Sequence, residues 1–360
     1  MSTYDAVTDL PLTIESCELE PLELRFTEEF TRMTTLVRLR GDGQDGVGED
    51  VTYDGLDHVA LQAAGAPAGL AGSYTVDAFS RRLDEVELWP SPPVRETSRD
   101  YRRWAFESAA LDLGLRQAGR SLADAVGRDL SPLNFVVSMR LVPPTWEGPE
   151  TADRLLRLLE RYPNTRFKLD PGNGWTRELV DQLVATGAVD VLDLKGFYRG
   201  TPVDVRTDPE LYRMVAEAFP AAWLEDPDLT DETLPVLEPH KDRLTCDAPI
   251  HSVADIEQRP WKPRVINIKP SRFGTLRRLF DTYDYCNPEG IGAYGGGQTE
   301  LGVGRDQIQY LASLFHPDTP NDTAPGAYNA IEIADGLPTS PLEPRPARTG
   351  FGWDRAASTI

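Results

Sequence analysis

The sequence has few cysteines and few basic residues for its length. Its three cysteines, Cys17, Cys246 and Cys286, are widely spaced and form no Cys-x-x-Cys pair. This argues against a disulfide framework and a cysteine-based zinc site, and it fits a reducing compartment. Lysine and arginine together number 37 against 58 aspartates and glutamates, which gives a formal charge of −21 and an isoelectric point near 4.6. A nucleic-acid partner, which needs a basic footprint, is therefore not expected.

Long apolar runs and several common catalytic motifs are also missing. No run approaches the roughly 18 consecutive apolar residues that would cross a membrane, and residues 1–9 carry neither the basic nor the apolar part of a signal peptide. We therefore expect a soluble cytoplasmic protein without a membrane partner. The glycine run 295–297 fits neither nucleotide-loop pattern, and no Gly-x-Ser-x-Gly elbow or His-Glu-x-x-His helix occurs.

The 360 residues suit a barrel of about 250 residues plus a smaller domain. Residues 1–130 are predicted to be an α+β capping domain whose last helices lead into the barrel. Alternating apolar residues over 34–40, followed by turn residues and then 47–49, indicate an antiparallel hairpin. A loop region is expected after it, up to a proline-rich break at 89–93, and a helical pair over 101–127.

Residues 131–335 repeat a strand-helix pattern, which predicts right-handed βαβ units and a parallel (β/α) barrel of the TIM type. The expected strands cover residues 134–141, 166–170, 189–195, 222–225, 243–247, 265–269, 290–294 and, weakly, 328–333. The expected helices include 152–161, 176–186, 209–218 and 274–285. Residues 336–360 are too rich in proline for a helix and are predicted to return to the capping domain.

Three acidic residues and one lysine end four successive predicted strands. They are Asp193, Glu225, Asp247 and Lys269, at intervals of 32, 22 and 22 residues. Any one of these acids alone could be a helix cap, but the ordered series would gather at one rim of a barrel, where functional groups lie. Carboxylates that meet there repel one another unless a cation holds them. Oxygen ligands without a histidine or cysteine cluster favour Mg²⁺, with Mn²⁺ possible.

In this order of motifs the chain resembles the enolase superfamily, in the mandelate racemase and muconate lactonizing enzyme branch. The resemblance covers nearly the whole chain, and the matching segments are 34–49, 105–114, 269–274 and 295–304, together with the three acidic positions. It implies that Asp193, Glu225 and Asp247 bind the metal and that Lys269 is a base, because such sites combine a lysine or histidine base with Mg²⁺.

Two departures from the family pattern concern the second and third strands. Many members carry Lys-x-Lys on the second strand and use its second lysine as a base, whereas this chain reads Lys168-Leu-Asp170. Lys168 is expected to contact the substrate carboxylate or to assist electrostatically, and Asp170 is expected to be ionised and a poor base. Strand alternation would point Lys195, two residues after Asp193, into the site. Lys195 could act as a catalytic acid, or it could pair with Asp170.

Two further acids are candidates for contact with the substrate. Glu300, in the glycine-rich segment, could touch the substrate or could hold the turn. Glu49 begins the segment 49–54, where we expect substrate specificity to lie. His251 is predicted to be a surface loop residue, and the absence of a histidine on the seventh strand disfavours a His–Asp pair of the mandelate racemase type.

These residues predict metal-assisted removal of the proton α to a carboxylate, with Lys269 as base and the enediolate charge stabilised by Mg²⁺ and Lys168. A single strong base favours elimination or cycloisomerisation of a small carboxylate, of the muconate cycloisomerase, o-succinylbenzoate synthase or acid-sugar dehydratase kind. A racemase or epimerase of the same superfamily is the first alternative. The second is a metal-binding barrel that has lost catalysis and acts as a binding protein. The resemblance also implies a homo-oligomer.

Overall fold

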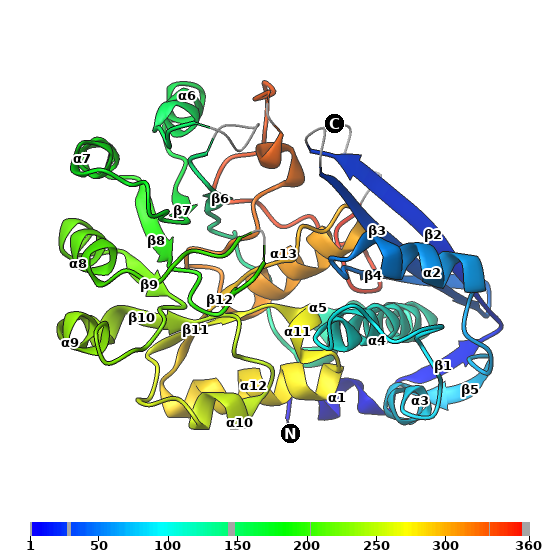
Figure 1. Cartoon of the computed structure of the whole chain (residues 1–360). Helices are drawn as coiled ribbons and strands as arrows, with labels where there is room; N and C mark the ends of the chain where they lie inside the picture. Colours follow the sequence, from blue (N-terminus) through cyan, green and yellow to red (C-terminus); the bar gives the residue numbers. More distant parts are fainter. Residues whose placement is uncertain (1, 27–29, 143–147, 202, 331, 355–360) are drawn as a thin grey trace.

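The computed structural model describes residues 2–26, 30–142, 148–201, 203–330 and 332–354. An antiparallel sheet and its helices, from the N-terminal third of the chain, lie beside a curved parallel sheet with helices along its outer side (Figure 1). The predicted combination of an α+β capping domain and a parallel (β/α) barrel is thereby confirmed.

The N-terminal sheet is antiparallel, with its three strands in the order β2-β3-β4. These strands are β2 (Ser16–Arg25), β3 (Thr31–Gly41) and β4 (Gln44–Asp50). A short helix α1 (Asp5–Thr8) and strand β1 (Pro11–Ile14) precede them, and β1 pairs with β5 (Gly72–Thr75). Asp42 and Gly43, both at positive φ, close the β3–β4 hairpin, as their turn chemistry predicts.

Residues 55–83, which were expected to be a loop region, contain regular structure. They form α2 (Gly55–Ala64), the edge strand β5 and α3 (Val76–Leu83). In α3 the buried residues Val76, Phe79 and Leu83 recur at helical spacing, and Thr75 caps the first turn by accepting a hydrogen bond from Ala78 N at 3.1 Å. The prediction of a loop was wrong because this short amphipathic pattern was overlooked.

The predicted helical pair is α4 (Ser98–Gln117) and α5 (Leu122–Val126). Strand β4 lies directly against α4, and a Cβ at Gly48 would collide with the carbonyl oxygen of Ala105. The Gly-Val-Gly-Glu segment at the end of the hairpin therefore reflects close packing between strand and helix. Ser121 and Asp124 form a capping box that starts α5.

The second sheet has seven strands in the order β12-β11-β10-β9-β8-β7-β6, and every neighbouring pair is parallel. The strands are β6 (Val137–Met139), β7 (Phe167–Leu169), β8 (Val189–Asp193), β9 (Trp223–Glu225), β10 (Leu244–Cys246), β11 (Val265–Ile268) and β12 (Gly292–Gly295). Because all of them run the same way, their carboxyl ends meet at one rim.

Helices connect these strands and line the outer side of the sheet (Figure 1). They are α6 (Asp153–Arg161), α7 (Arg177–Thr186), α8 (Pro209–Ala218), α9 (Leu234–Leu237), α10 (Val253–Glu257), α11 (Pro270–Phe273), α12 (Leu276–Glu289) and α13 (Val303–Phe315), with the 3₁₀ turns η1 (Glu238–Arg243) and η2 (Gly326–Asn329). Thr176, Asp208 and Thr275 cap α7, α8 and α12 through their side chains. The bounds of α8 are those predicted from the sequence.

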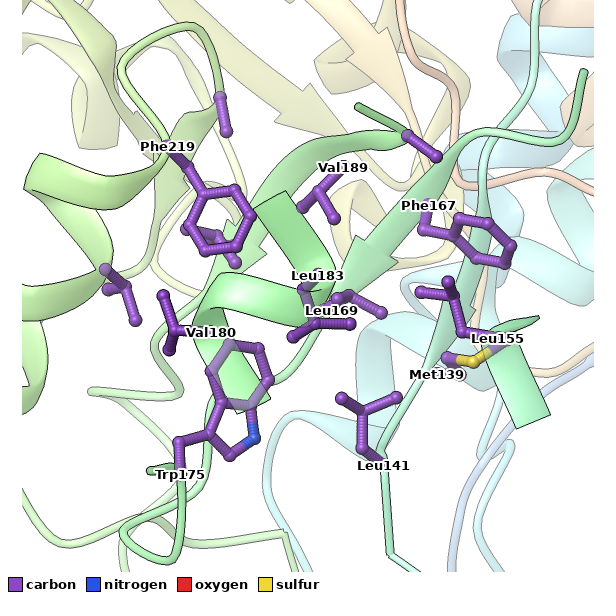
Figure 2. Packing of buried hydrophobic residues seen from close by; sticks show 14 of the residues in the cluster. Met139, Leu141, Leu155, Phe167, Leu169, Trp175, Val180, Leu183, Val189 and Phe219 are labelled. Atoms are coloured by element: carbon purple, nitrogen blue, oxygen red, sulfur yellow. The ribbon is translucent and has the colours of Figure 1, made fainter. Parts of the chain in front are cut away.

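One hydrophobic core fills the space between strands β6–β10 and helices α6–α9, and a second core packs β11 against α12 and α13. Figure 2 shows Phe167 and Leu169 of β7 packed with Leu155 of α6 and with Val180 and Leu183 of α7. All five side chains are buried. Each contributes roughly 1.5–3 kcal/mol through burial, and together they fix the strand positions that carry the rim residues.

The eighth position of the barrel differs from the prediction. Among the described residues of 328–333 none belongs to a strand, and η2 occupies the start of that range. Asn321 and Asp322 fill the position instead, through single parallel bridges to Phe135 and Gly296.

The side chain of Asn321 compensates for the short backbone pairing at this position. It accepts a hydrogen bond from Gly295 N at 2.5 Å and donates one to Asn134 O at 2.9 Å. Its oxygen also meets His316 Nδ1 at 2.7 Å. A polar hub therefore joins the last strand to the first, where a ladder of backbone hydrogen bonds would be expected.

The C-terminal segment runs back along helices α4 and α5. Leu342 bridges to Leu133, Gly350 bridges to Ser121, and the ring of Phe351 meets Trp104 edge-on at 6.5 Å. Residues 355–360 of the predicted returning segment lie outside the described residues. Within the described ranges, the helices are too short or too polar to cross a membrane.

Candidate active site at the barrel rim

Three buried carboxylates meet at the carboxyl ends of neighbouring strands. Asp193 ends β8, Glu225 ends β9 in register with it, and Asp247 directly follows β10. Each of the three offers a carboxylate oxygen that lies within 4.8 Å of the other two, and none of the three side chains is exposed. We call these three residues the rim cluster. The structure thus brings together the set that the sequence singled out.

The donor chemistry of the rim cluster fits a hard divalent cation. All three donors are carboxylate oxygens, which Mg²⁺ and Ca²⁺ prefer, and they converge from three separate strands. Buried carboxylates this close together are stable only with positive charge beside them. The positive charge that the structure itself provides comes from lysine and arginine side chains.

Lys168, from β7, is the most deeply buried of these bases. Its ammonium donates to Glu225 Oε1 and lies 3.3 Å from Asp193 Oδ2 and 3.5 Å from Asp322 Oδ2. Burial alone would lower its pKa, but the attraction of these carboxylates outweighs burial and holds the pKa of Lys168 well above its usual value. Lys168 is therefore a fixed positive charge inside the barrel.

Lys269 follows β11 and stands at the other end of the row of carboxylates. Its Nζ atom lies 2.9 Å from Asp247 Oδ2. A Cβ at Gly296 would lie 2.7 Å from Lys269 Cε, so a glycine lets the chain after β12 pass close to the lysine. This closeness explains part of the glycine-rich segment that follows the seventh strand.

Lys195 reaches the site by a different route from the one predicted. Strand β8 ends at Asp193, and Lys195 adopts a left-handed backbone conformation with φ of 54°. Its backbone N–H donates to Asp193 Oδ1 at 3.2 Å, and its Nζ atom donates to Asp193 Oδ2 at 2.5 Å. The inward direction comes from this turn and not from strand alternation. Non-glycine residues rarely adopt the conformation, and it is typical of functional sites.

Asp170 occupies the place where a second lysine was expected. It lies 3.3 Å from Lys195 Nζ and 3.5 Å from Arg140 Nε. Burial raises the pKa of Asp170 above its usual value, although Lys195 and Arg140 act against this rise. The sequence argument weighed the neighbouring charges without burial, and its expectation that Asp170 is a poor base stays a prediction. Of the two alternatives for Lys195, the contact with Asp170 is present in the structure.

Two residues that the sequence argument missed surround Asp247. Arg272, on α11, forms an ion pair with Asp247 Oδ1 at 2.6 Å and donates to Tyr198 Oη at 2.9 Å. Tyr198 in turn donates to Asp247 Oδ2 at 3.2 Å. Burial opposes the charge on Asp247, but Arg272 and Lys269 outweigh it and hold the pKa of Asp247 far below its usual value. Arg272 lies inside the lysine motif, so its position was a usable signal.

Tyr294 is a further residue that the sequence did not mark. Its hydroxyl donates to Glu225 Oε2, on the opposite side from Lys168, and also meets Thr245 Oγ1 at 2.7 Å. The ring packs against Trp223 with 5.0 Å between centroids. Tyr294 is completely buried on β12, and only the order of the strands reveals that its hydroxyl reaches Thr245 on β10 and Glu225 on β9, two and three strands away.

Asp226 holds the backbone next to the rim cluster by accepting hydrogen bonds. Its backbone is left-handed, with φ of 48°, and its two carboxylate oxygens accept hydrogen bonds from Asp247 N and Ala248 N at 2.7 Å each. Burial and the neighbouring charge of Asp247 raise the pKa of Asp226 to about 7. It orients the backbone that carries Asp247.

Glu49, which was predicted to contact the substrate, accepts hydrogen bonds from three backbone N–H groups. Its Oε1 atom accepts a hydrogen bond from Leu301 N at 2.7 Å, and its Oε2 atom accepts from Gly302 N at 2.9 Å and Gly304 N at 2.8 Å. These N–H groups precede or begin α13, so Glu49 caps a barrel helix from the capping domain. The geometry gives Glu49 a structural role, and its contact with a substrate stays a prediction.

Glu300 lies in the same interface and has similar partners. Its Oε1 atom accepts a hydrogen bond from Gln298 N at 2.5 Å, and its Oε2 atom pairs with Arg305 Nη2 at 3.0 Å. Thr299, between them, has a positive φ of 57°. Of the two alternatives for Glu300, the contacts favour holding the turn. We call Glu49 and Glu300 together the capping joint.

His251 is half-buried and not the surface residue that was predicted. Its ring nitrogens lie 2.9 Å from Arg272 O and 3.1 Å from Ala248 O, and its Nδ1 atom lies 3.5 Å from Asp100 Oδ2. The loop after β10 is thereby tied to α4 and α11. The sequence could not show this, because the contact partners come from three separate segments.

Comparison with known proteins gives matches over most of the chain. The domain of unknown function (DUF8230) N-terminal domain matches residues 5–125, and the DUF8230 C-terminal domain matches residues 129–330. An N-succinylamino acid racemase from Thermus thermophilus is 25% identical, over 95% of this chain and 94% of its own length. An o-succinylbenzoate synthase from Bacillus subtilis is 29% identical, over 70% of this chain and 66% of its own.

Solved structures agree with these sequence matches. The dipeptide epimerase from Methylococcus capsulatus, complexed with a Mg ion, has a TM-score of 0.64 at 19% identity and covers 89% of this chain and 92% of its own. The capping domain and the parallel barrel are those of the enolase superfamily, in the mandelate racemase and muconate lactonizing enzyme branch. Within it, the chain belongs to the DUF8230 family.

Proposed function

We propose that the protein is a Mg²⁺-dependent enzyme that removes the proton α to the carboxylate of a small acid. The observation that carries the proposal is the row of three converging carboxylates with Lys195 at one end and Lys269 at the other. The names of the relatives, a racemase and a synthase acting on carboxylic acids, support the same class of chemistry.

The rim cluster would hold the ion through one oxygen from each residue, with Mn²⁺ as an alternative to Mg²⁺. When bound, the ion would supply charge stabilisation for a substrate carboxylate as negative charge builds on it. The buried surroundings of Asp193, Glu225 and Asp247 would strengthen every such interaction.

Lys269 is proposed to take the α-proton on its Nζ atom. A proton α to a carboxylate is very weakly acidic, so its removal needs positive charge beside both carboxylate oxygens in the transition state. Lys168 would supply a fixed part of that charge, because its ammonium is buried and held in place by two members of the rim cluster. Such positioning needs no reorganisation during the reaction.

Lys195 is proposed to act on the side opposite Lys269. In an elimination, the C–H electron pair forms the new double bond, the bond from the β-carbon to oxygen breaks, and the leaving oxygen takes a proton from Lys195. Cycloisomerisation would use the same proton abstraction without release of water. Asp170, 3.3 Å from Lys195 Nζ, would keep the ammonium aimed at this side.

A racemase or epimerase is the second candidate, and one observation favours it. Lys195 and Lys269 contact opposite ends of the rim cluster, so one could take the α-proton and the other could return a proton to the opposite face. The constitution of the product distinguishes the two candidates, because elimination removes the β-substituent, whereas racemisation keeps it and inverts the α-carbon.

The test is α-proton exchange in D₂O. The purified protein is incubated with Mg²⁺ and a panel of acid sugars, N-acylamino acids, dipeptides and cyclic carboxylates, and the α-protons are followed by NMR. We expect conversion or deuterium uptake with at least one class, lost on addition of EDTA. Lys269→Ala should lower the rate on the order of 10³-fold, while Lys262→Ala, at an exposed surface lysine, should not.

Two results would contradict the proposal. Exchange that continues in EDTA at full rate would remove the metal from the chemistry. No exchange across the panel, in a sample shown to bind Mg²⁺, would favour the metal-binding barrel that acts as a binding protein. In that case the first explanation to test is that Asp170, in place of the second lysine, has abolished catalysis.

A further inference from the structure

Ten charged side chains at the rim form two neighbouring groups of ion pairs, and in the two groups together acids and bases are equal in number. Five are acids and five are bases, and each pair lies within 4.0 Å. The acids are Asp170, Asp193, Glu225, Asp247 and Asp322, and the bases are Arg140, Lys168, Lys195, Lys269 and Arg272. Asp247 pairs with Lys269 and Arg272, and the other seven residues form the second group. We call the ten residues together the network, and their formal charges sum to zero before any metal ion enters it.

The chain has few lysines, and most of them belong to this network. The sequence contains five lysines, of which Lys168, Lys195 and Lys269 stand in the network. The other two, Lys241 and Lys262, form exposed surface pairs. A bound divalent cation would add two positive charges to a neutral buried network, which is unfavourable unless one of the bases moves away or a negative ligand arrives.

Lys195 can leave the rim cluster and still keep an acidic partner, Asp170. Lys168 is held by Glu225 and Asp322 as well as by Asp193, and it is almost fully buried. Lys195 instead bridges Asp193, inside the rim cluster, and Asp170, outside it. If the ammonium of Lys195 leaves Asp193, it keeps an acid partner 3.3 Å away.

The backbone also holds Lys195 beside Asp193, one of the three proposed metal ligands. Its left-handed turn is held by hydrogen bonds on both sides, from Leu194 N to Glu225 O at 2.8 Å and from Gly196 N to Asp226 O at 2.8 Å. The same residue contacts both oxygens of Asp193, one through its N–H and one through its ammonium. Lys195 Nζ and a metal ion would therefore compete for Asp193.

We infer that Lys195 is an exchangeable counter-ion, which neutralises Asp193 in the metal-free protein and passes to Asp170 when a divalent cation binds. This inference rests on the proposed metal site and adds to it. It assigns Lys195 as a side chain that lowers the affinity for the metal and that stabilises the metal-free fold together with Asp170. Asp170 then receives the ammonium that the cation displaces.

The test is calorimetric titration of the full-length, metal-free protein with Mg²⁺ alone. Lys195→Asn should bind Mg²⁺ at least tenfold more tightly than the wild type, because the competing charge is gone while the backbone N–H to Asp193 remains. Lys195→Arg, which keeps the charge, should stay within about threefold of the wild type. Lys262→Asn removes the same charge from an exposed pair with Glu289 and should leave the affinity unchanged.

A second readout does not depend on binding heat. In the metal-free state Lys195→Asn should lower the midpoint of thermal unfolding, because Asp193 and Asp170 lose a shared partner. Mg²⁺ should then raise that midpoint by more than it does for the wild type, since the tighter-binding protein gains more from the ligand.

The Asp170→Asn variant tests the other half of the exchange, and it serves if Lys195→Asn does not fold. With no acid to receive Lys195, the ammonium should stay on Asp193, and Mg²⁺ should bind at least threefold more weakly. In the double variant this effect of Asp170→Asn should shrink, because no ammonium is left to displace. An unchanged or tighter affinity of Asp170→Asn would overturn the exchange.

The outcomes separate this inference from the proposed function. Equal Mg²⁺ affinity in wild type and Lys195→Asn would overturn the counter-ion role and leave the metal site standing. No Mg²⁺ binding by any variant would overturn the metal site and this inference together. Tighter binding by Lys195→Asn, with no α-proton exchange by the wild type across the panel, would uphold the counter-ion role and contradict the proposed reaction.

Discussion

The rim cluster and the capping joint are both made of buried acids, but their partners differ in kind. Asp193, Glu225 and Asp247 face lysine, arginine and tyrosine side chains, each carried on a separate element. Glu49 faces three backbone N–H groups at the start of one helix. A side-chain cation can move away and be replaced, whereas a backbone N–H cannot leave its position.

This difference in partners separates a functional site from a structural contact between domains. Burial and residue type are the same in both places, so neither property identifies function. At the rim, removal of a base leaves other bases and room for a different cation, so the charges can be rearranged. At the joint, removal of the acid leaves three buried or partly buried backbone N–H groups without their acceptor. We therefore expect changes at the rim to alter binding and catalysis, and changes at the joint to alter stability.

The largest expected effect in this comparison is at the joint. Glu49→Ala should lower the free energy of unfolding by about 2–4 kcal/mol, because three N–H groups, one buried and two partly buried, lose their acceptor. Chemical denaturation followed by circular dichroism measures it, with Glu96→Ala at an exposed position as the control, expected within about 0.5 kcal/mol of the wild type. If Glu49→Ala keeps its stability and loses only activity, the joint belongs to the site after all.

Changes at the polar hub around Asn321 and His316, at the eighth barrel position, should alter stability, as changes at the capping joint should. Burial lowers the pKa of His316 from an ordinary 6.5 to about 4, so the unfolded chain binds more protons than the folded protein between these values. The free energy of unfolding should therefore fall as the pH drops from about 6.5 towards 4, by up to about 3 kcal/mol. His316→Gln should flatten this slope in denaturation curves at pH 7, 6 and 5, and an unchanged slope would assign it to other groups.

The smallest expected effect is at the rim itself. Tyr294→Phe removes the hydroxyl that orients Glu225 and should weaken Mg²⁺ binding by roughly tenfold, with little loss of stability. Tyr328→Phe, at a buried tyrosine that donates to Pro338 O, is the matched control and should leave Mg²⁺ binding unchanged. Equal effects of the two variants on metal affinity would show that Tyr294 acts only through general packing.

The sequence predicted the rim better than its surroundings for a physical reason. Strand ends recur with the strand-helix repeat, so Asp193, Glu225, Asp247 and Lys269 could be placed from spacing alone. Tyr294 and Asp322 reach the same site from the seventh strand and the eighth position, and only the closed barrel brings them there. The inward direction of Lys195 was predicted, but from strand alternation, because a left-handed turn leaves no trace in the residue pattern.

The misplaced elements have equally specific causes. The eighth barrel position consists of single bridges at Asn321 and Asp322, which is too short to give a strand pattern. The apolar stretch at 328–333 was chosen in its place. In the capping domain, the helical spacing of Val76, Phe79 and Leu83 was present in the sequence, so α3 could have been predicted. The joint could not, because Glu49 and Leu301 lie far apart along the chain.

The measurement that tests the central claim most directly is an anomalous diffraction map of crystals soaked in Mn²⁺, which stands in for Mg²⁺. The account predicts one strong anomalous peak between the carboxylates of Asp193, Glu225 and Asp247, with an oxygen of each within about 2.0–2.3 Å of it. It also predicts no peak in crystals of Glu225→Gln. A map without a peak at the rim cluster, or with its strongest peak at the capping joint, would contradict the division between exchangeable and fixed charge.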